Sequence, residues 1–266
     1  MTTQDYYNLP PDENGWRTLS NGNEFKLGLD CIIRNGVRIG NRAVISNNTT
    51  IGIGAIIDNG AVIGEDAYIG DNASIDKYAT IGDCTVIGNS AKIGDGADIG
   101  NGAYIGNSVL IGDGANIGNN VVIGNGAYIG NWVIIGIDTK LGDGAKIGAG
   151  AYIGNWVIIG DGAIIGDGAK IGKKVKIDNY TTIDNYTTID DNVLIGYRAT
   201  IGYKSTIGDC TVIGDGAKIG DGASIADDVV IGNNVKIDTD AYINACPAIG
   251  NDVSVSNMIK QYTLSL

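Results

Sequence analysis

The stretch IGDCTVIGDGAKI, at residues 207–219, places an aliphatic residue at every sixth position, and the chain is built on that spacing. The same phase runs without insertion or deletion from Leu27 to Val255, which gives 39 positions. Isoleucine fills 36 of them, and Leu27, Leu141 and Val255 fill the others. A period of six with a glycine in most units fits neither the α-helix nor the coiled coil. The pattern therefore predicts a repeat protein that grows along one axis.

Each six-residue unit has the same order around its aliphatic residue. A small or β-branched residue stands two positions earlier, as Ala61 stands before Ile63. Residues two apart face the same way on an extended chain, so both point inward and the residue between them points outward. Asp, Asn and Gly follow, as in Asp95–Gly96, and favour a turn because they tolerate left-handed backbone angles. We expect short strands, stacked about 4.8 Å apart, around columns of isoleucine.

The motif I-G-x-x-A/V/T-x, as in IGNGAY at 123–128 and IGDGAK at 213–218, resembles the hexapeptide-repeat (bacterial transferase) superfamily. The resemblance covers residues 27–255 and implies an all-β fold, a left-handed parallel β-helix of triangular section. Three hexads per coil then make about 13 coils, with no extruded loops. Residues 1–26 lack the hexad phase and are expected to form an N-terminal cap or a partner-binding arm. Residues 256–266 are expected to be a C-terminal tail that caps the last coil.

The outward residues sort into three faces when three hexads make a coil. On the face that begins with Ile32, nine of 13 outward residues are bulky and apolar or aromatic, against five and four on the other faces. A continuous apolar stripe is typical of an interface, and members of the resembled superfamily are commonly homotrimers. We therefore expect a homotrimer through Ile32, Tyr68, Val86, Tyr104, Val122, Ile158, Leu194, Val212 and Val230. The alternative is that valine and tyrosine merely suit strands.

Charge and composition restrict the partners. The chain of 266 residues has 30 acidic and 18 basic residues and a formal net charge of −12, so we expect no direct nucleic-acid ligand and no membrane contact. It contains no long apolar run, and its start lacks the pattern of a secretory leader. The four cysteines show no paired spacing, which favours a reduced, cytoplasmic environment.

The resemblance also implies an activity. The best-known reaction of the superfamily is acyl transfer from an acyl-coenzyme A or acyl carrier protein, commonly with a histidine base between subunits. This chain has no histidine, which also excludes the three-histidine zinc site of carbonic anhydration. Acidic residues stack at corners, as Asp191, Asp209 and Asp227 do, where they could hold calcium, but turn formation explains them as well. We predict no catalytic residue, no cofactor and no metal site.

Aromatic residues at corners form a candidate contact site. Trp132 and Trp156 lie within two near-copies of GAYIGNWVIIG, and Tyr180 and Tyr186 lie within DNYTTIDNYTTID. Exposed tryptophan is typical of a contact site, although packing against a neighbouring coil or subunit explains it equally well.

The preferred hypothesis is a non-catalytic structural or protein-binding β-solenoid, an acidic rigid scaffold for an unidentified protein partner. The first alternative is an acyl-CoA-dependent acyltransferase with a base other than histidine. Two lesser alternatives are an ice-binding solenoid and an acidic rod that imitates nucleic acid.

Overall fold

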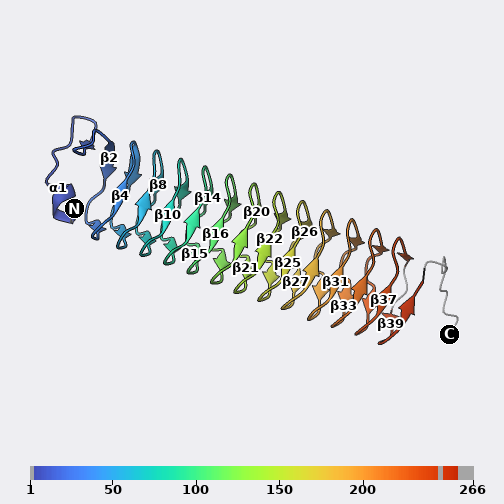
Figure 1. Ribbon diagram of the computed structural model, residues 1–266. Coiled ribbons are helices and arrows are strands. Elements are labelled where there is room, and N and C mark those ends of the chain that lie inside the picture. The colour runs from blue at the N-terminus through green and yellow to red at the C-terminus, as the bar shows by residue number, and fades with distance from the viewer. Residues whose placement is uncertain (1–2, 245–247, 257–266) are drawn as a thin grey trace. The chain divides into compact units, whose positions relative to one another are not determined.

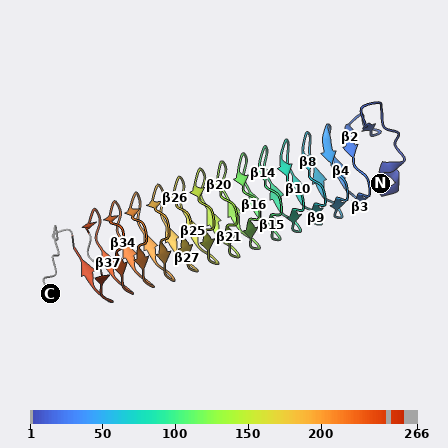
Figure 2. The same cartoon turned by 180° about the vertical axis from the view of Figure 1, so that it is seen from behind.

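The chain forms coils of a parallel β-solenoid, divided between two compact units, Met1–Trp132 and Val133–Leu266. The computed structural model describes residues 3–244 and 248–256. Figures 1 and 2 show, from opposite sides, short strands that recur at equivalent places in successive coils. Each coil has three strands and three corners, and the coils number about 13 in all. Within the described residues, the one helix is α1 (Thr3–Tyr7).

The strands of the first unit form three sheets. Sheet A contains β1 (Trp16–Thr18), β2 (Glu24–Leu27), β5 (Ala43–Ile45), β8 (Val62–Ile63), β11 (Thr80–Ile81), β14 (Asp98–Ile99) and β17 (Asn116–Ile117). Sheet B contains β3 (Ile32–Ile33), β6 (Thr50–Ile51), β9 (Tyr68–Ile69), β12 (Val86–Ile87), β15 (Tyr104–Ile105) and β18 (Val122–Ile123). Sheet C contains β4 (Arg38–Ile39), β7 (Ile56–Ile57), β10 (Ser74–Ile75), β13 (Lys92–Ile93), β16 (Leu110–Ile111) and β19 (Tyr128–Ile129).

The second unit repeats this arrangement in sheets A′, B′ and C′. Sheet A′ contains β20 (Ile134–Ile135), β23 (Tyr152–Ile153), β26 (Lys170–Ile171), β29 (Thr188–Ile189), β32 (Thr206–Ile207), β35 (Ser224–Ile225) and β38 (Tyr242–Ile243). Sheet B′ contains β21 (Lys140–Leu141), β24 (Ile158–Ile159), β27 (Lys176–Ile177), β30 (Leu194–Ile195), β33 (Val212–Ile213), β36 (Val230–Ile231) and β39 (Ala248–Ile249). Sheet C′ contains β22 (Lys146–Ile147), β25 (Ile164–Ile165), β28 (Thr182–Ile183), β31 (Thr200–Ile201), β34 (Lys218–Ile219), β37 (Lys236–Ile237) and β40 (Ser254–Val255).

The strand register confirms the predicted coil. Parallel partners lie 18 residues apart, as Ile81 pairs with Ile99 and Ile99 with Ile117. From β2 to β38, no connection between consecutive strands exceeds four residues, so no loop leaves the coils there. The predicted all-β solenoid without extruded loops is therefore correct.

The hexad isoleucines fill the interior, as predicted. From Ile33 to Ile243, every residue at the aliphatic position is buried. The residue two positions earlier is also inward, and it is polar in some coils. Thr85 is one of these, and its hydroxyl donates a hydrogen bond to the carbonyl of Gly100 at 3.0 Å. The buried hydroxyl is thus satisfied, so threonine is compatible with an otherwise apolar core.

The N-terminal segment packs against the first coil. Tyr6 of α1 is buried edge-to-face against Phe25, with ring centroids 5.8 Å apart, and its hydroxyl donates to the carbonyl of Val37. β1 extends sheet A by antiparallel pairing with β2. A cap formed by residues 1–26 remains a prediction that these contacts favour. Of the expected capping tail, residues 257–266 lie outside the described part of the chain.

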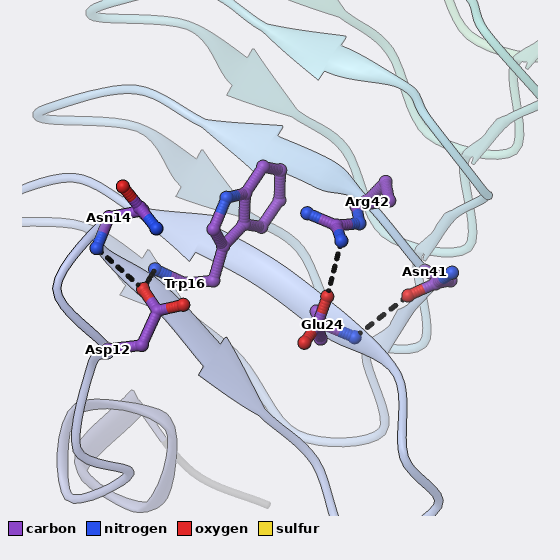
Figure 3. Close-up of polar contacts among 6 residues, drawn as sticks. All are labelled: Asp12, Asn14, Trp16, Glu24, Asn41 and Arg42. Atoms are coloured by element: carbon purple, nitrogen blue, oxygen red, sulfur yellow. Dashed lines mark hydrogen bonds and ion pairs between the residues drawn. The ribbon is translucent and has the colours of Figure 1, made fainter.

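The same segment is joined to the first coil by charged groups. Figure 3 shows the ion pair between Glu24 and Arg42, 2.9 Å apart, beside the ring of Trp16. The guanidinium of Arg42 lies 4.6 Å from the Trp16 ring centroid, and the ammonium of Lys26 lies 4.8 Å from it. Both are cation–π contacts, so Trp16 joins β1 to β2 and to the next coil.

Three residues follow each aliphatic residue and form a corner, as Gly100, Asn101 and Gly102 follow Ile99. Each of the three positions selects its residue for a different reason. The first is usually glycine because the next coil is too close: a Cβ at Gly100 would lie 2.5 Å from Oδ1 and 2.7 Å from the backbone nitrogen of Asn119. The second is usually Asp or Asn, since its Oδ1 accepts a backbone N–H one coil earlier, as Asn119 accepts from Asn101 at 2.9 Å. Only the third has a positive φ, 68° at Gly102 and 56° at Asn120. Left-handed angles therefore account for the third residue, as expected, whereas contacts with a neighbouring coil account for the first two.

Candidate functional site

The predicted interface residues of the first unit form a row on the outward face of sheet B. Tyr68, Val86, Tyr104 and Val122 stand on consecutive paired strands. Tyr104 is 49% exposed, whereas Val86 is half-buried between its neighbours. Ile32, at 52% exposed, is separated from this row by Thr50.

In the second unit, the corresponding row on sheet B′ is interrupted. Leu194, Val212 and Val230 are consecutive on paired strands. Ile158 stands apart, between Lys140 and Lys176. Each unit thus brings most of its predicted interface residues together, and the homotrimeric interface remains a prediction.

Charge distinguishes sheet B from the other faces of the first unit. Its six outward residues are all uncharged: Ile32, Thr50, Tyr68, Val86, Tyr104 and Val122. The face of sheet A carries Lys26 and Asp98, and that of sheet C carries Arg38 and Lys92. Covering sheet B with another chain would therefore desolvate no charged outward side chain, so its desolvation cost is the lowest of the three faces.

The two predicted tryptophans both occupy the third corner position. Trp132 has φ 59° and is 70% exposed, and its ring lies where a Cβ on Gly114 would be, so it packs over the preceding coil. Trp156 has φ 58° and is also exposed. A bulky residue at positive φ costs about 1–2 kcal/mol. Packing on a neighbouring coil thus accounts for part of the Trp132 environment, and the role of both residues as a contact site remains a prediction.

Two further aromatic pairs lie at corners of the second unit. Tyr180 packs edge-to-face on Tyr197, and Tyr186 packs in the same way on Tyr203, with centroids 5.9 Å apart in both pairs. Arg198 lies over the Tyr197 ring at 4.9 Å. Sequence reasoning identified Tyr180 and Tyr186 but missed their partners. The signal in the sequence was the spacing of 17 residues between the two tyrosines of each pair. This is one residue less than a full coil, because the first tyrosine is the third residue of its corner and its partner is the second residue of the next one.

Stacked carboxylates form one corner of the second unit. Oδ1 of Asp209 accepts the backbone N–H of Asp191 at 2.7 Å, and Oδ1 of Asp227 accepts that of Asp209 at 2.9 Å. Burial, and then the carboxylates of Asp209, Asp227 and Asp191, raise the pKa of the adjacent Asp190 above its ordinary value. Across residues 3–244 and 248–256, no three His, Cys, Asp or Glu side chains are grouped as they would be around a metal ion.

Asp190→Asn is expected to raise the midpoint of thermal unfolding at pH 7. A raised pKa means that the folded chain binds the Asp190 proton more tightly than the unfolded chain does. The stability contributed by this group is therefore present below the ordinary pKa and is lost as the pH rises through the raised value. Asparagine carries no charge and does not lose this stability, so the unfolding midpoint of Asp190→Asn should exceed that of the wild type at pH 7 and equal it near pH 3. Circular dichroism at the two pH values measures both midpoints.

The matched control is Asp98→Asn, which removes the same charge from an exposed outward position on β14. This change should leave the midpoint nearly unchanged at both pH values. Equal midpoints for Asp190→Asn and the wild type at pH 7 would contradict the assignment of repulsion and burial at this corner.

No helix in the described part of the chain has the length and apolarity needed to cross a membrane.

Family models match successive parts of the chain. The bacterial transferase hexapeptide model, of six repeats, matches residues 77–113, 102–136 and 138–173. The hexapeptide repeat of succinyl-transferase matches residues 26–52. The model described as the GMPPB C-terminal domain matches residues 171–262. Among curated proteins, none matches this sequence.

Several solved structures are similar to parts of the chain. A UDP-N-acetylglucosamine acyltransferase from Francisella novicida is 20% identical with TM-score 0.31, over 70% of this chain and 62% of that one. The enzyme of the same name from Bacteroides fragilis is 23% identical with TM-score 0.33, over 62% and 65%. A GDP-perosamine N-acetyltransferase variant from Caulobacter crescentus, solved with CoA and GDP-perosamine, is 21% identical with TM-score 0.34, over 46% and 52%. The chain thus spans about half to two thirds of their lengths.

The hexapeptide matches agree with the unbroken period of six and with the stacked three-strand coils. The chain belongs to the hexapeptide-repeat superfamily, whose fold is the left-handed parallel β-helix.

Proposed function

We propose that this chain is a non-catalytic scaffold that forms a homotrimer through the outward faces of sheets B and B′ and presents its other, acidic surfaces to a protein partner. The observation that carries the proposal is the uncharged row of Tyr68, Val86, Tyr104 and Val122. These four bulky side chains stand on consecutive strands of a rigid face, an arrangement that favours burial against another chain.

Electrostatics favours the same face. Three copies with a formal charge of −12 each repel one another, so association costs least where no charge must be desolvated. Sheet B meets that condition in the first unit, whereas the faces of sheets A and C would bury Asp98 or Lys92. In the first unit, a cyclic interface through sheet B therefore has the largest apolar gain and the smallest polar cost.

The proposed absence of catalysis is supported by the regular coils. Family enzymes of this kind are expected to hold substrate in loops that leave the solenoid, and from β2 to β38 no connection exceeds four residues. The sequence also lacks histidine, the expected base. The corner carboxylates accept backbone N–H groups one coil earlier, as Asp209 does from Asp191, so their position has a structural cause.

An acyltransferase is the second candidate, favoured by the transferase descriptions of two matching family models. Its base would have to be a residue other than histidine. Isothermal titration of the full chain with acetyl-CoA and with coenzyme A separates the two functions. Saturable binding of either would favour the transferase, and the scaffold proposal expects none at millimolar ligand.

Tyr104→Glu is expected to convert a trimer into monomers. Tyr104 is at the centre of the proposed interface, and three glutamates brought together there would be desolvated and would repel one another, at a cost of several kcal/mol. Size-exclusion chromatography with light scattering measures the mass, and far-UV circular dichroism checks the fold.

The control is Asn116→Glu, which places the same charge on the outward face of sheet A. This variant should remain trimeric. A trimeric Tyr104→Glu variant, or an Asn116→Glu variant that dissociates equally, would refute sheet B as the interface.

A further inference from the structure

Two corners of the second unit carry tyrosine at a position that usually serves the fold. Tyr197 and Tyr203 are the second residues of their corners, and they are the two aromatic residues at that position between Leu27 and Val255. The usual Asp or Asn accepts a backbone N–H one coil earlier, as Oδ1 of Asp215 accepts that of Tyr197 at 2.8 Å. Tyrosine has no oxygen at that place. Each tyrosine therefore replaces a group that joins one coil to the next.

The lost acceptor is supplied from within the preceding corner. The N–H of Asn179, one coil before Tyr197, donates to Oδ1 of Asp178 at 2.7 Å. The other corner makes the same replacement, because the N–H of Asn185 donates to Oδ1 of Asp184 at 2.6 Å. Contacts between coils thus give no reason for tyrosine, and the chain compensates for its presence. A departure from the repeat that is compensated nearby is typical of a functional surface.

The two corners belong to the same two coils and flank the same strands of sheet C′. The Tyr180–Tyr197 pair precedes β28 and β31, and the Tyr186–Tyr203 pair follows them. Tyr180 and Tyr186 are each 56% exposed, and each ring lies over a glycine of the preceding coil. Equivalent corner positions are six residues apart along the chain, so the two pairs are separated by at most about 20 Å.

The strip between the two aromatic pairs carries hydroxyl groups. Its outward residues are Ile164, Thr182 and Thr200, on consecutive paired strands of sheet C′. Ile164 and Thr200 are exposed, and Thr182 is half-buried. Each threonine hydroxyl can both donate and accept a hydrogen bond, as can the tyrosine hydroxyls at the two ends. The surface thus combines rings at its ends with hydroxyl groups at its centre.

The charges at these corners are mixed. Arg198 lies over the Tyr197 ring at 4.9 Å, and Lys204 lies over the Tyr203 ring at 5.1 Å. Carboxylates offset these cations, since Asp221 of the next coil accepts the backbone N–H of Tyr203 at 2.9 Å. A polyanion therefore gains little here. A protein interface usually has its apolar residues at the centre and polar ones at the rim, which is the reverse of this arrangement.

We propose that this surface binds a neutral oligosaccharide of glucose-type sugars, which lies along β28 and β31 from one aromatic pair to the other. In such sugars the hydroxyls are equatorial, so C–H groups cover both faces of the ring and pack on aromatic side chains. The sugar hydroxyls would exchange hydrogen bonds with Thr182, Thr200 and the tyrosine hydroxyls. Sheet C′ is not part of the proposed trimer interface, so the proposal does not depend on the oligomeric state.

The binding test uses the full chain and isothermal titration with cellohexaose, maltohexaose and chitohexaose, and with glucose and decaproline for comparison. We expect saturable binding of at least one hexasaccharide, with glucose weaker by about tenfold or more because it can contact only one aromatic pair. No saturable binding of any hexasaccharide at millimolar concentration would overturn the proposal, as would equal affinity for glucose. Tighter binding of decaproline, an extended peptide that also packs on aromatic surfaces, would assign the surface to a polypeptide instead.

A double variant, Tyr197→Asn with Tyr203→Asn, separates binding from folding. Asparagine is a usual residue of the second corner position and can accept the N–H of the preceding coil. The affinity for the hexasaccharide should therefore fall by about tenfold or more, whereas the midpoint of thermal unfolding should stay the same or rise. The control is Tyr152→Asn, which removes an exposed tyrosine from β23 of sheet A′ and should leave the affinity unchanged.

Tyr186→Gly tests the same surface by a second route. Tyr186 has φ 57°, which glycine adopts without strain, so this variant removes a ring and keeps the corner. Its affinity for the hexasaccharide should also fall by about tenfold or more. Undiminished affinity in Tyr186→Gly or in the double variant, or an equal loss in Tyr152→Asn, would place the ligand elsewhere and refute the assignment.

Discussion

Ile99→Asp is expected to destabilise the first unit by more than about 4 kcal/mol, which is enough to abolish its folded state. Ile99 is fully buried on β14 and pairs with Ile81 and Ile117 in the neighbouring coils. A carboxylate at this position would be surrounded by aliphatic side chains with no cation or N–H donor to receive it. Urea denaturation followed by circular dichroism measures the loss.

The matched control is Asn116→Asp, which places a carboxylate on the outward side of the adjacent strand β17. The chain already tolerates such a group at Asp98, next to Ile99 on β14. The control should therefore change stability by less than about 0.5 kcal/mol. Similar losses for the two variants would mean that inward and outward positions do not alternate along the strands.

Gly100→Ala is expected to cost about 2–3 kcal/mol, although alanine lowers the entropy of the unfolded chain. The added Cβ would lie 2.5 Å from Oδ1 of Asn119 and 2.7 Å from its backbone nitrogen. Neither atom can move freely, because that oxygen accepts the N–H of Asn101 and the nitrogen is part of the corner. Thermal or urea unfolding of the variant measures the cost.

Gly126→Ala provides the comparison. Gly126 has φ 66° and no atom within 4 Å of its ideal Cβ, so alanine there meets only left-handed strain of about 1–2 kcal/mol. If contact with the next coil selects Gly100, alanine should lower the free energy of unfolding less at Gly126 than at Gly100. The reverse order would contradict contact with the next coil as the main reason for glycine directly after the isoleucine.

The strand path was predictable because one physical requirement recurs in every unit. A six-residue unit must bury its aliphatic residue, and the residue two positions earlier on a strand faces the same way. Ala61 and Ile63 are both buried for this reason, and the same pattern orients every strand. Stacking identical units keeps the isoleucines in columns, and the resemblance to the hexapeptide-repeat superfamily supplied three hexads per coil. The observed partners, such as Ile81 and Ile99, follow from that number.

The corners and the contacts of the N-terminal segment were less predictable because they join residues that are far apart in the sequence. Nothing local shows that Gly100 must leave room for Asn119, since the two are 19 residues apart. The Tyr180–Tyr197 pair likewise joins different positions of successive corners. Tyr6, which precedes the hexad phase, likewise donates its hydroxyl to the carbonyl of Val37, 31 residues later. Sequence periodicity contains no information on that contact.

The mass of the unmodified chain in solution tests the central proposal most directly. Sedimentation equilibrium from about 1 to 50 μM should give a single species of three times 27.5 kDa, independent of concentration, because the sheet B face is bulky, uncharged and exposed. A mass of 27.5 kDa across that range would contradict self-association through sheet B and the scaffold built on it.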